Sequence, residues 1–250
     1  MNKTQPTALG PFLCYTPEVE RRGHISIDSP GLIRLKSRVK ELVNVHDQEF
    51  IEPRTGYHNA LLADHLENVE LYSEVIAHLL GCGREEIYKI SLIGYLHDFS
   101  KTVWHGHRIE GPLPESERAA KEGHAKLSKV MLIQLGSSMG LTEAEWKTLR
   151  SVCFGVRYHH TPERLAQISH RVHAVRELKL ASIVHFVDIY VGMREYRGPS
   201  HPGVSHADAI TSIEARFRKS KYGYLSQVAP PMIEALNQPL VEGLELQIRG

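Results

Sequence analysis

The sequence is poor in cysteine and in long apolar runs. Its three cysteines, Cys14, Cys82 and Cys153, are odd in number and lack CxxC spacing, which argues against a disulfide framework or a cysteine zinc site and favours free thiols in a reducing compartment. No segment approaches the ~18 consecutive apolar residues of a membrane span. The first residues do not combine a basic region with an apolar one. We therefore expect a cytoplasmic protein that does not associate with membranes.

The sequence also lacks an excess of charge of either sign. The formal net charge is +1 over 250 residues, with 24% charged and 42% hydrophobic residues, which is ordinary for a globular protein that buries a sizeable core. We therefore expect no stable complex with nucleic acid. What the sequence does have is histidine, at sixteen positions, and their placement is informative.

The pattern of apolar residues predicts one all-helical domain. Residues 1–30 are rich in Pro, Gly and charge without periodicity, which predicts an N-terminal arm. From Gly31 to about residue 50 the apolar residues follow helical spacing. We expect a helical domain over residues 31–236 and a C-terminal tail over 237–250.

Several later segments have helical spacing and carry a histidine on the apolar face. In NALLADHLENVELYSEVIAHLLG, the apolar positions Val69, Tyr72, Ile76 and Leu79 extend backward to His65. In ESERAAKEGHAKLSKVMLIQLG, His124 shares a face with Leu127. Both histidines are therefore expected to point inward.

Two further segments place histidines at the end of a helix. EEIYKISLIGYLHD has an apolar face that ends at His97, beside Asp98. The segment opening TEAE is a capping box, and its apolar face continues to His160, with His159 beside it. In ELKLASIVHFVDIYVG, Asp188 lies on an apolar face, where an unpaired carboxylate would cost several kcal/mol.

A single inward histidine is usually a core residue hydrogen-bonded to a carbonyl. Five histidines and two aspartates on consecutive helices are too many for a small core to satisfy separately, whereas one or two divalent cations would satisfy them together. Adjacent His97 and Asp98 can aim at two metals, with the carboxylate bridging them. The residues thus predict a metal site.

This ordered set resembles the HD superfamily of metal-dependent phosphohydrolases, and more closely its HD-GYP branch, over roughly residues 60–235. LIGYLHDFSK resembles the family's LLHDIGK, YHHTPE resembles its paired-histidine motif, and IVHFVDIYVGMREYR resembles its late aspartate segment. The resemblance implies an HD-domain helical bundle around a dinuclear site. The implied metal ligands are His65, His97, Asp98, His124, His159, His160 and Asp188, and the implied substrate-binding residues are Lys101, Arg194 and Arg197.

The chain also departs from the family pattern. The Gly-Tyr-Pro tripeptide that gives the HD-GYP branch its name does not occur. Leu61 stands four residues before His65, where some relatives have a glutamate for a third metal. Two metals are therefore expected.

The resemblance implies a phosphodiesterase or phosphatase that acts on a phosphorylated small molecule, a nucleotide or a cyclic nucleotide through a metal-bridging hydroxide. Asp98 and Lys101 are the implied catalytic residues. The histidine-rich donor set favours two iron or manganese ions over magnesium. Two alternatives stay open, a di-iron oxygenase of the HD type and a degenerate HD-GYP-like binding module. His105 and His107 follow Lys101 closely and could line the pocket or lie in a solvated loop.

Overall fold

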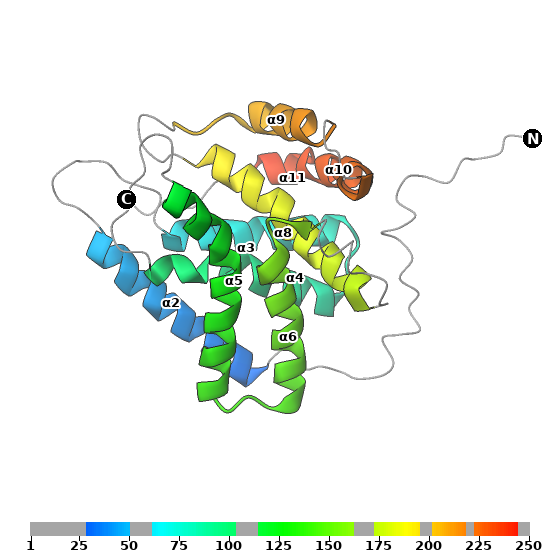
Figure 1. The fold of residues 1–250 in the computed structure, drawn as a ribbon. Coiled ribbons are helices and arrows are strands. Elements are labelled where there is room, and N and C mark those ends of the chain that lie inside the picture. Colours follow the sequence, from blue (N-terminus) through cyan, green and yellow to red (C-terminus); the bar gives the residue numbers. More distant parts are fainter. Residues whose placement is uncertain are drawn as a thin grey trace, which may run out of the picture.

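Helices form all the regular structure in the part of the chain described by the computed structural model, which comprises residues 29–50, 62–103, 115–162, 173–195, 202–218 and 223–244 (Figure 1). The prediction of an all-α fold is confirmed. Among these residues, no helix has both the length and the apolar character needed to cross a bilayer. The elements are α2 (Pro30–Phe50), α3 (Leu62–Leu79), α4 (Arg84–Leu96), the 3-10 helix η2 (Phe99–Val103), α5 (Glu115–Ser138), α6 (Glu143–Tyr158), α8 (His173–Arg194), α9 (His206–Arg218), α10 (Gly223–Leu236) and α11 (Pro239–Glu242).

The pair α3 and α4 forms the centre of the fold. Gly81 lies in the turn between α3 and α4 and has φ 67°, a conformation that glycine adopts without steric cost. The two helices then approach closely, because a Cβ at Gly94 would lie only 2.9 Å from Cα of Glu70. This contact brings the end of α4, where His97 and Asp98 follow, against the helix that carries His65.

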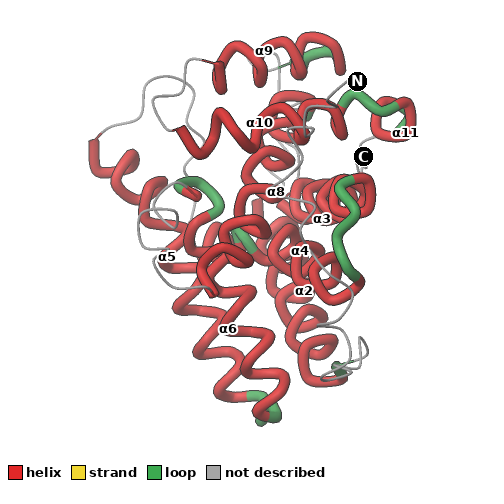
Figure 2. The backbone as a smooth tube through the Cα atoms, turned by 90° about the vertical axis from the view of Figure 1, so that its right-hand side faces the viewer, coloured by secondary structure: helices red, strands yellow, loops and turns green. Residues whose placement is uncertain are grey.

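Helices α5 and α6 form a hairpin that projects from the rest of the bundle (Figures 1 and 2). The capping box at its turn forms as predicted, since Thr142 accepts a hydrogen bond from the backbone N–H of Glu145 and the Glu145 carboxylate accepts one from the N–H of Thr142. The expectation that Leu127 lies on the buried face with His124 is wrong. Leu127 is 38% exposed, and Ser128 takes the buried position beside it.

Helix α8 crosses the bundle, and α9, α10 and α11 lie beyond it (Figure 2). The segment after α10 packs onto the core, because Val241 is fully buried and Tyr72 donates a hydrogen bond to the carbonyl oxygen of Leu244 at 2.7 Å. The division into an arm, a helical domain and a tail stays a prediction. Residues 1–28 and 245–250 lie outside the described part.

Candidate metal centre

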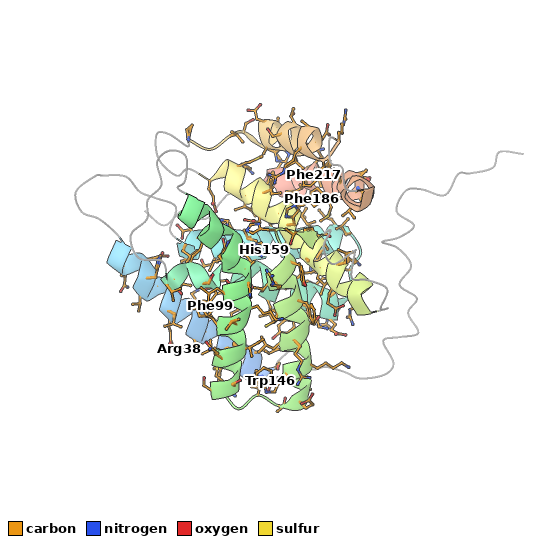
Figure 3. The ribbon with its side chains drawn as sticks, viewed as in Figure 1. Arg38, Phe99, Trp146, His159, Phe186 and Phe217 are labelled. Carbon is orange, nitrogen blue, oxygen red and sulfur yellow. The ribbon has the colours of Figure 1, made fainter. Side chains whose placement is uncertain are left out.

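Five helices bring the seven predicted ligands together. His65 comes from α3, and His97 caps the C-terminal end of α4, with Asp98 next to it. His124 comes from α5, the pair His159 and His160 ends α6, and Asp188 comes from α8. His159 is labelled in Figure 3, where α5, α6 and α8 meet. Sequence positions up to 123 residues apart thus converge.

Most of these side chains are buried. His97 and His159 are 0% exposed, Asp98 1% and His124 2%. His160 is the exception, because its side chain is 41% exposed. The apolar pattern placed His160 inward, whereas the structure turns His159 into the core and leaves His160 at the solvent edge.

The donor atoms form overlapping groups whose members lie within 4.8 Å of one another. One group contains His65, His97 and Asp98, and a second contains Asp98, His124, His159 and His160. A third joins His97 and His159 with Asp188. Asp98 is shared by the first two groups, which is the arrangement that the sequence predicted for a bridging carboxylate.

Close contacts link the histidines to both aspartates and to each other. Oδ1 of Asp98 lies 2.9 Å from Nε2 of His124, and Oδ2 lies 3.2 Å from Nε2 of His97. Oδ1 of Asp188 lies 3.3 Å from Nε2 of His65. Nε2 of His160 lies 2.8 Å from Nε2 of His124. Nitrogen and oxygen donors therefore face a common interior.

In His97 and His159 the other ring nitrogen points away from the centre to a backbone carbonyl. Nδ1 of His97 donates to the carbonyl of Gly94 at 2.8 Å, and Nδ1 of His159 donates to the carbonyl of Val156 at 2.7 Å. Because a carbonyl oxygen only accepts, Nδ1 carries the hydrogen in both rings, and Nε2 of the neutral ring keeps a free lone pair. Both Nε2 atoms are buried without a hydrogen-bond partner. A buried lone pair of this kind suits a divalent cation.

The charges at the centre also fit a cation. Burial would raise the pKa of Asp98, but Lys101, followed by His97 and His124, holds it well below its usual range. The same holds for Asp188, where His65 and His97 lower the pKa against the effect of burial. Both carboxylates are therefore charged at neutral pH.

The histidines differ in their titration. Burial lowers the pKa of His159 well below its usual value, so this ring is neutral and ready to act as a ligand. Burial opposes a proton on His97, but the charges of Asp98 and Asp188 outweigh it and raise the pKa of His97 to about 9. A divalent cation would take the place of that proton.

The predicted substrate-binding residues Lys101 and Arg194 have different partners. Nζ of Lys101 contacts Oδ2 of Asp98, and the lysine side chain is 35% exposed. Arg194 instead donates from Nη1 to the hydroxyl of Tyr190 at 2.8 Å. Because Arg194 and Asp188 are six positions apart on α8, their side chains leave the helix about 120° apart. The role of Arg194 in phosphate binding stays a prediction, and Arg197, His105 and His107 lie outside the described residues.

One residue at the centre was missed. Both carboxylate oxygens of Glu195 lie 3.0 Å from Nδ1 of His65, and Glu195 is 2% exposed. Burial alone would lower the pKa of His65, but Glu195, with Asp188 and Asp98, raises it well above its usual value. A sequence signal existed, because Glu195 follows Asp188 by seven positions, two helical turns along the same face.

This fold and site define a class of protein, namely helical proteins with a buried histidine and aspartate centre suited to divalent metals. The family model for the HD domain matches residues 62–193. Since this is more than half of the 250 residues, the chain belongs to the HD-domain family, as the resemblance indicated. A comparison with curated proteins gave no match.

Proposed function

We propose that this chain is a metal-dependent phosphohydrolase whose centre holds two divalent transition-metal ions. The observation that carries the proposal is the shared position of Asp98 between two groups of buried donors, with Lys101 beside it at the solvent edge. The first ion would be held by His65, His97, Asp98 and Asp188, and the second by Asp98, His124, His159 and His160. Iron or manganese suits this set, because imidazole donors outnumber carboxylates.

The charge of such a centre suits a phosphate substrate. Two divalent ions against the carboxylates of Asp98 and Asp188 leave a net positive charge in a buried site, which attracts an anion. When bound, such a pair supplies a nucleophile from water and a Lewis acid for a phosphoryl oxygen. In the hydrolysis, the oxygen of water bonds to phosphorus, the phosphorus bond to the leaving oxygen breaks, and that oxygen takes a proton.

The protein's own residues orient this chemistry. Asp98 belongs to both donor groups and so fixes their positions relative to each other. Its contact with Lys101 keeps the ammonium beside the centre. An ammonium in this position would stabilise the charge that develops on a phosphoryl oxygen. Lys101 is partly exposed, so it can meet a substrate that enters past His160.

The substrate class proposed is a phosphodiester or phosphomonoester of a nucleotide or cyclic nucleotide. The absence of the Gly-Tyr-Pro tripeptide leaves cyclic di-GMP as one compound to test rather than the assigned substrate. The test is elemental analysis of protein purified without added metal, followed by assays on aryl phosphates, nucleotides and cyclic dinucleotides. We expect about two equivalents of iron or manganese and release of phosphate or of a nucleotide monoester.

Two results would replace this proposal. Metal-loaded protein that turns over no phosphoester but reacts with dioxygen through a redox-active iron pair would make the chain a di-iron oxygenase. Protein that takes up no metal on reconstitution, yet binds a nucleotide, would make it a binding module.

A further inference from the structure

The exposed face of α6 carries an aromatic side chain among cations. Lys147, Arg150, Phe154 and Arg157 follow one another at intervals of three and four residues and therefore share one face of the helix. Phe154 is 44% exposed in the middle of this face. A large apolar ring in such a position has no role in the core.

Further cations and a second ring lie around Phe154. Nζ of Lys129, from α5, lies 5.4 Å from the ring centroid of Phe154. The ring of Tyr158 is 6.5 Å from that of Phe154 and within 10° of parallel, and the guanidinium of Arg157 lies 5.6 Å from the Tyr158 ring. Aromatic rings with cations over them form a surface that can stack flat groups and attract anions. We refer to Lys129, Lys147, Phe154, Arg157 and Tyr158 as the aromatic–basic strip.

The hairpin that carries the strip has a local excess of positive charge. Residues 123–160 include five lysines and arginines against two glutamates. Glu145 is 9% exposed and is used in the helix cap, and Glu143 lies 3.2 Å from Arg150. The chain as a whole has a net charge of only +1, so residues 123–160 are more positive than the rest of the sequence.

The strip leads to the metal centre. Tyr158 is followed directly by His159 and His160, and His160 is the exposed member of the donor set. From Lys147 to Tyr158 the strip extends about 16 Å at 1.5 Å per helical residue. In a duplex each strand carries one phosphate per ~3.4 Å of helix axis, and a single strand is more extended, so the strip is long enough to span more than one phosphate.

We propose that the aromatic–basic strip binds a short single strand of nucleic acid and delivers one of its phosphodiesters to the metal centre. Bases stack on Phe154 and Tyr158, while Lys129, Lys147 and Arg157 contact phosphates, which is how proteins hold single strands without reading sequence. The inference rests on the proposed function, because the strand is the substrate of that site. In the reaction, water oxygen bonds to phosphorus, the ester bond to one sugar oxygen breaks, and that oxygen takes a proton. A substrate cleaved in this way forms a transient complex, in keeping with the low net charge.

The test uses the full chain loaded with metal and a fluorescently labelled tetrathymidylate. Anisotropy measures binding, and product analysis measures kcat and KM for the same compound. We expect Phe154→Ala and Arg157→Gln each to weaken binding about 10-fold or more and to raise KM, while turnover of a small aryl phosphodiester stays at the wild-type value. The matched controls are Leu240→Ala, at an apolar side chain that is 59% exposed, and Arg218→Gln, at a side chain that is 79% exposed. Both should bind tetrathymidylate as the wild type does.

The possible outcomes test the strip proposal and the proposed function of the metal centre independently. If the protein hydrolyses aryl phosphodiesters but the strip variants bind and cleave tetrathymidylate like wild type, the strip proposal is overturned and the proposed function stands. If no phosphoester is hydrolysed while the strip variants still lose binding, the proposed function falls and the strip remains a binding surface. If the same variants lose binding to vesicles containing anionic lipid and not to tetrathymidylate, the strip faces a membrane and our proposal is overturned.

Discussion

Glu195 and His65 lie next to each other at the centre although 130 positions separate them in the chain, with both carboxylate oxygens 3.0 Å from Nδ1 of the imidazole. The contact leaves Nε2 of His65 directed toward Asp188 and Asp98. A carboxylate behind a ligating histidine fixes the ring orientation and increases the basicity of the nitrogen that binds metal. If the centre holds metal as proposed, Glu195 is a positioning residue for His65.

The first prediction concerns this contact. Glu195→Gln keeps an oxygen that can accept from Nδ1 but removes the charge, so the affinity for one of the two metal equivalents should fall about 10- to 100-fold. Competition with a chelator at fixed pH measures this loss. Glu41→Gln is the control, because Glu41 is a 64% exposed partner of Arg38 and its replacement should leave both affinities unchanged. Wild-type affinity in Glu195→Gln would contradict the positioning role.

The second prediction compares a shared donor with an unshared one. Asp98 belongs to both donor groups, whereas His160 belongs to only one of them. Asp98→Asn should therefore reduce the bound metal toward zero, and His160→Ala should leave about one equivalent. Elemental analysis measures both, and circular dichroism confirms that each variant is folded. Equal metal loss in the two folded variants would rule out a shared Asp98.

The third prediction separates metal binding from phosphate binding. Lys101 contacts Asp98 but belongs to none of the donor groups, so Lys101→Ala should keep both metals. It should lower kcat on the best phosphoester about 10- to 1000-fold, the usual loss for one electrostatic contact in a shielded site. A variant with full metal content and full turnover would show that the lysine has no catalytic role.

The helical pattern predicted that most of these side chains would come together, because each proposed ligand lies on or at the end of an amphipathic helix. The apolar faces that end at His65 and His97 are buried as expected, except for Leu79 at the far end of the first face, which is 40% exposed. Glu195 could not be assigned in the same way, because its partner lies on another helix and the pattern describes one helix at a time. The orientation of His159 and His160 was missed for a related reason. They follow the last residue of α6, where the helical angle no longer decides which side chain faces inward.

The exposure of Leu127 has a related cause, because the apolar pattern does not show which neighbours a helix packs against. The spacing of Leu127 from His124 fits a helical face, but α5 packs mainly against α6 and η2, so a narrower stripe is buried than the pattern suggested. The spacing in the sequence places Phe154 on the charged face of α6, but it gives no sign that Lys129 of α5 lies beside the ring.

The fourth prediction concerns stability and pH at the turn of the hairpin. Glu145 joins the starts of α2 and α6, because its carboxylate accepts from Oγ of Ser29 at 2.8 Å and from the N–H groups of Gly31 and Thr142 at 2.6 and 2.8 Å. The backbone amide of Thr142, with Ser29 and Gly31, lowers the pKa of Glu145 to about 2 against the opposing effect of burial. A carboxyl group that has a lower pKa in the folded state than in the unfolded state stabilises the fold. Its contribution is full at any pH where the group is ionised in both states. The contribution is therefore full above pH 4.5, the ordinary value, and is lost as the pH falls toward 2.

Glu145→Gln should remove that contribution and lower the free energy of unfolding near pH 7 by about 1.5–3 kcal/mol, the range for hydrogen bonds to a charged group. The difference from wild type should shrink as the pH falls from 4.5 toward 2. Urea unfolding at a series of pH values measures both effects. Glu143→Gln is the matched control, since Glu143 lies on the same first turn but is 80% exposed, and exposed ion pairs contribute little. A pH-independent loss in Glu145→Gln would show that packing of the side chain, and not its charge, joins the two helices.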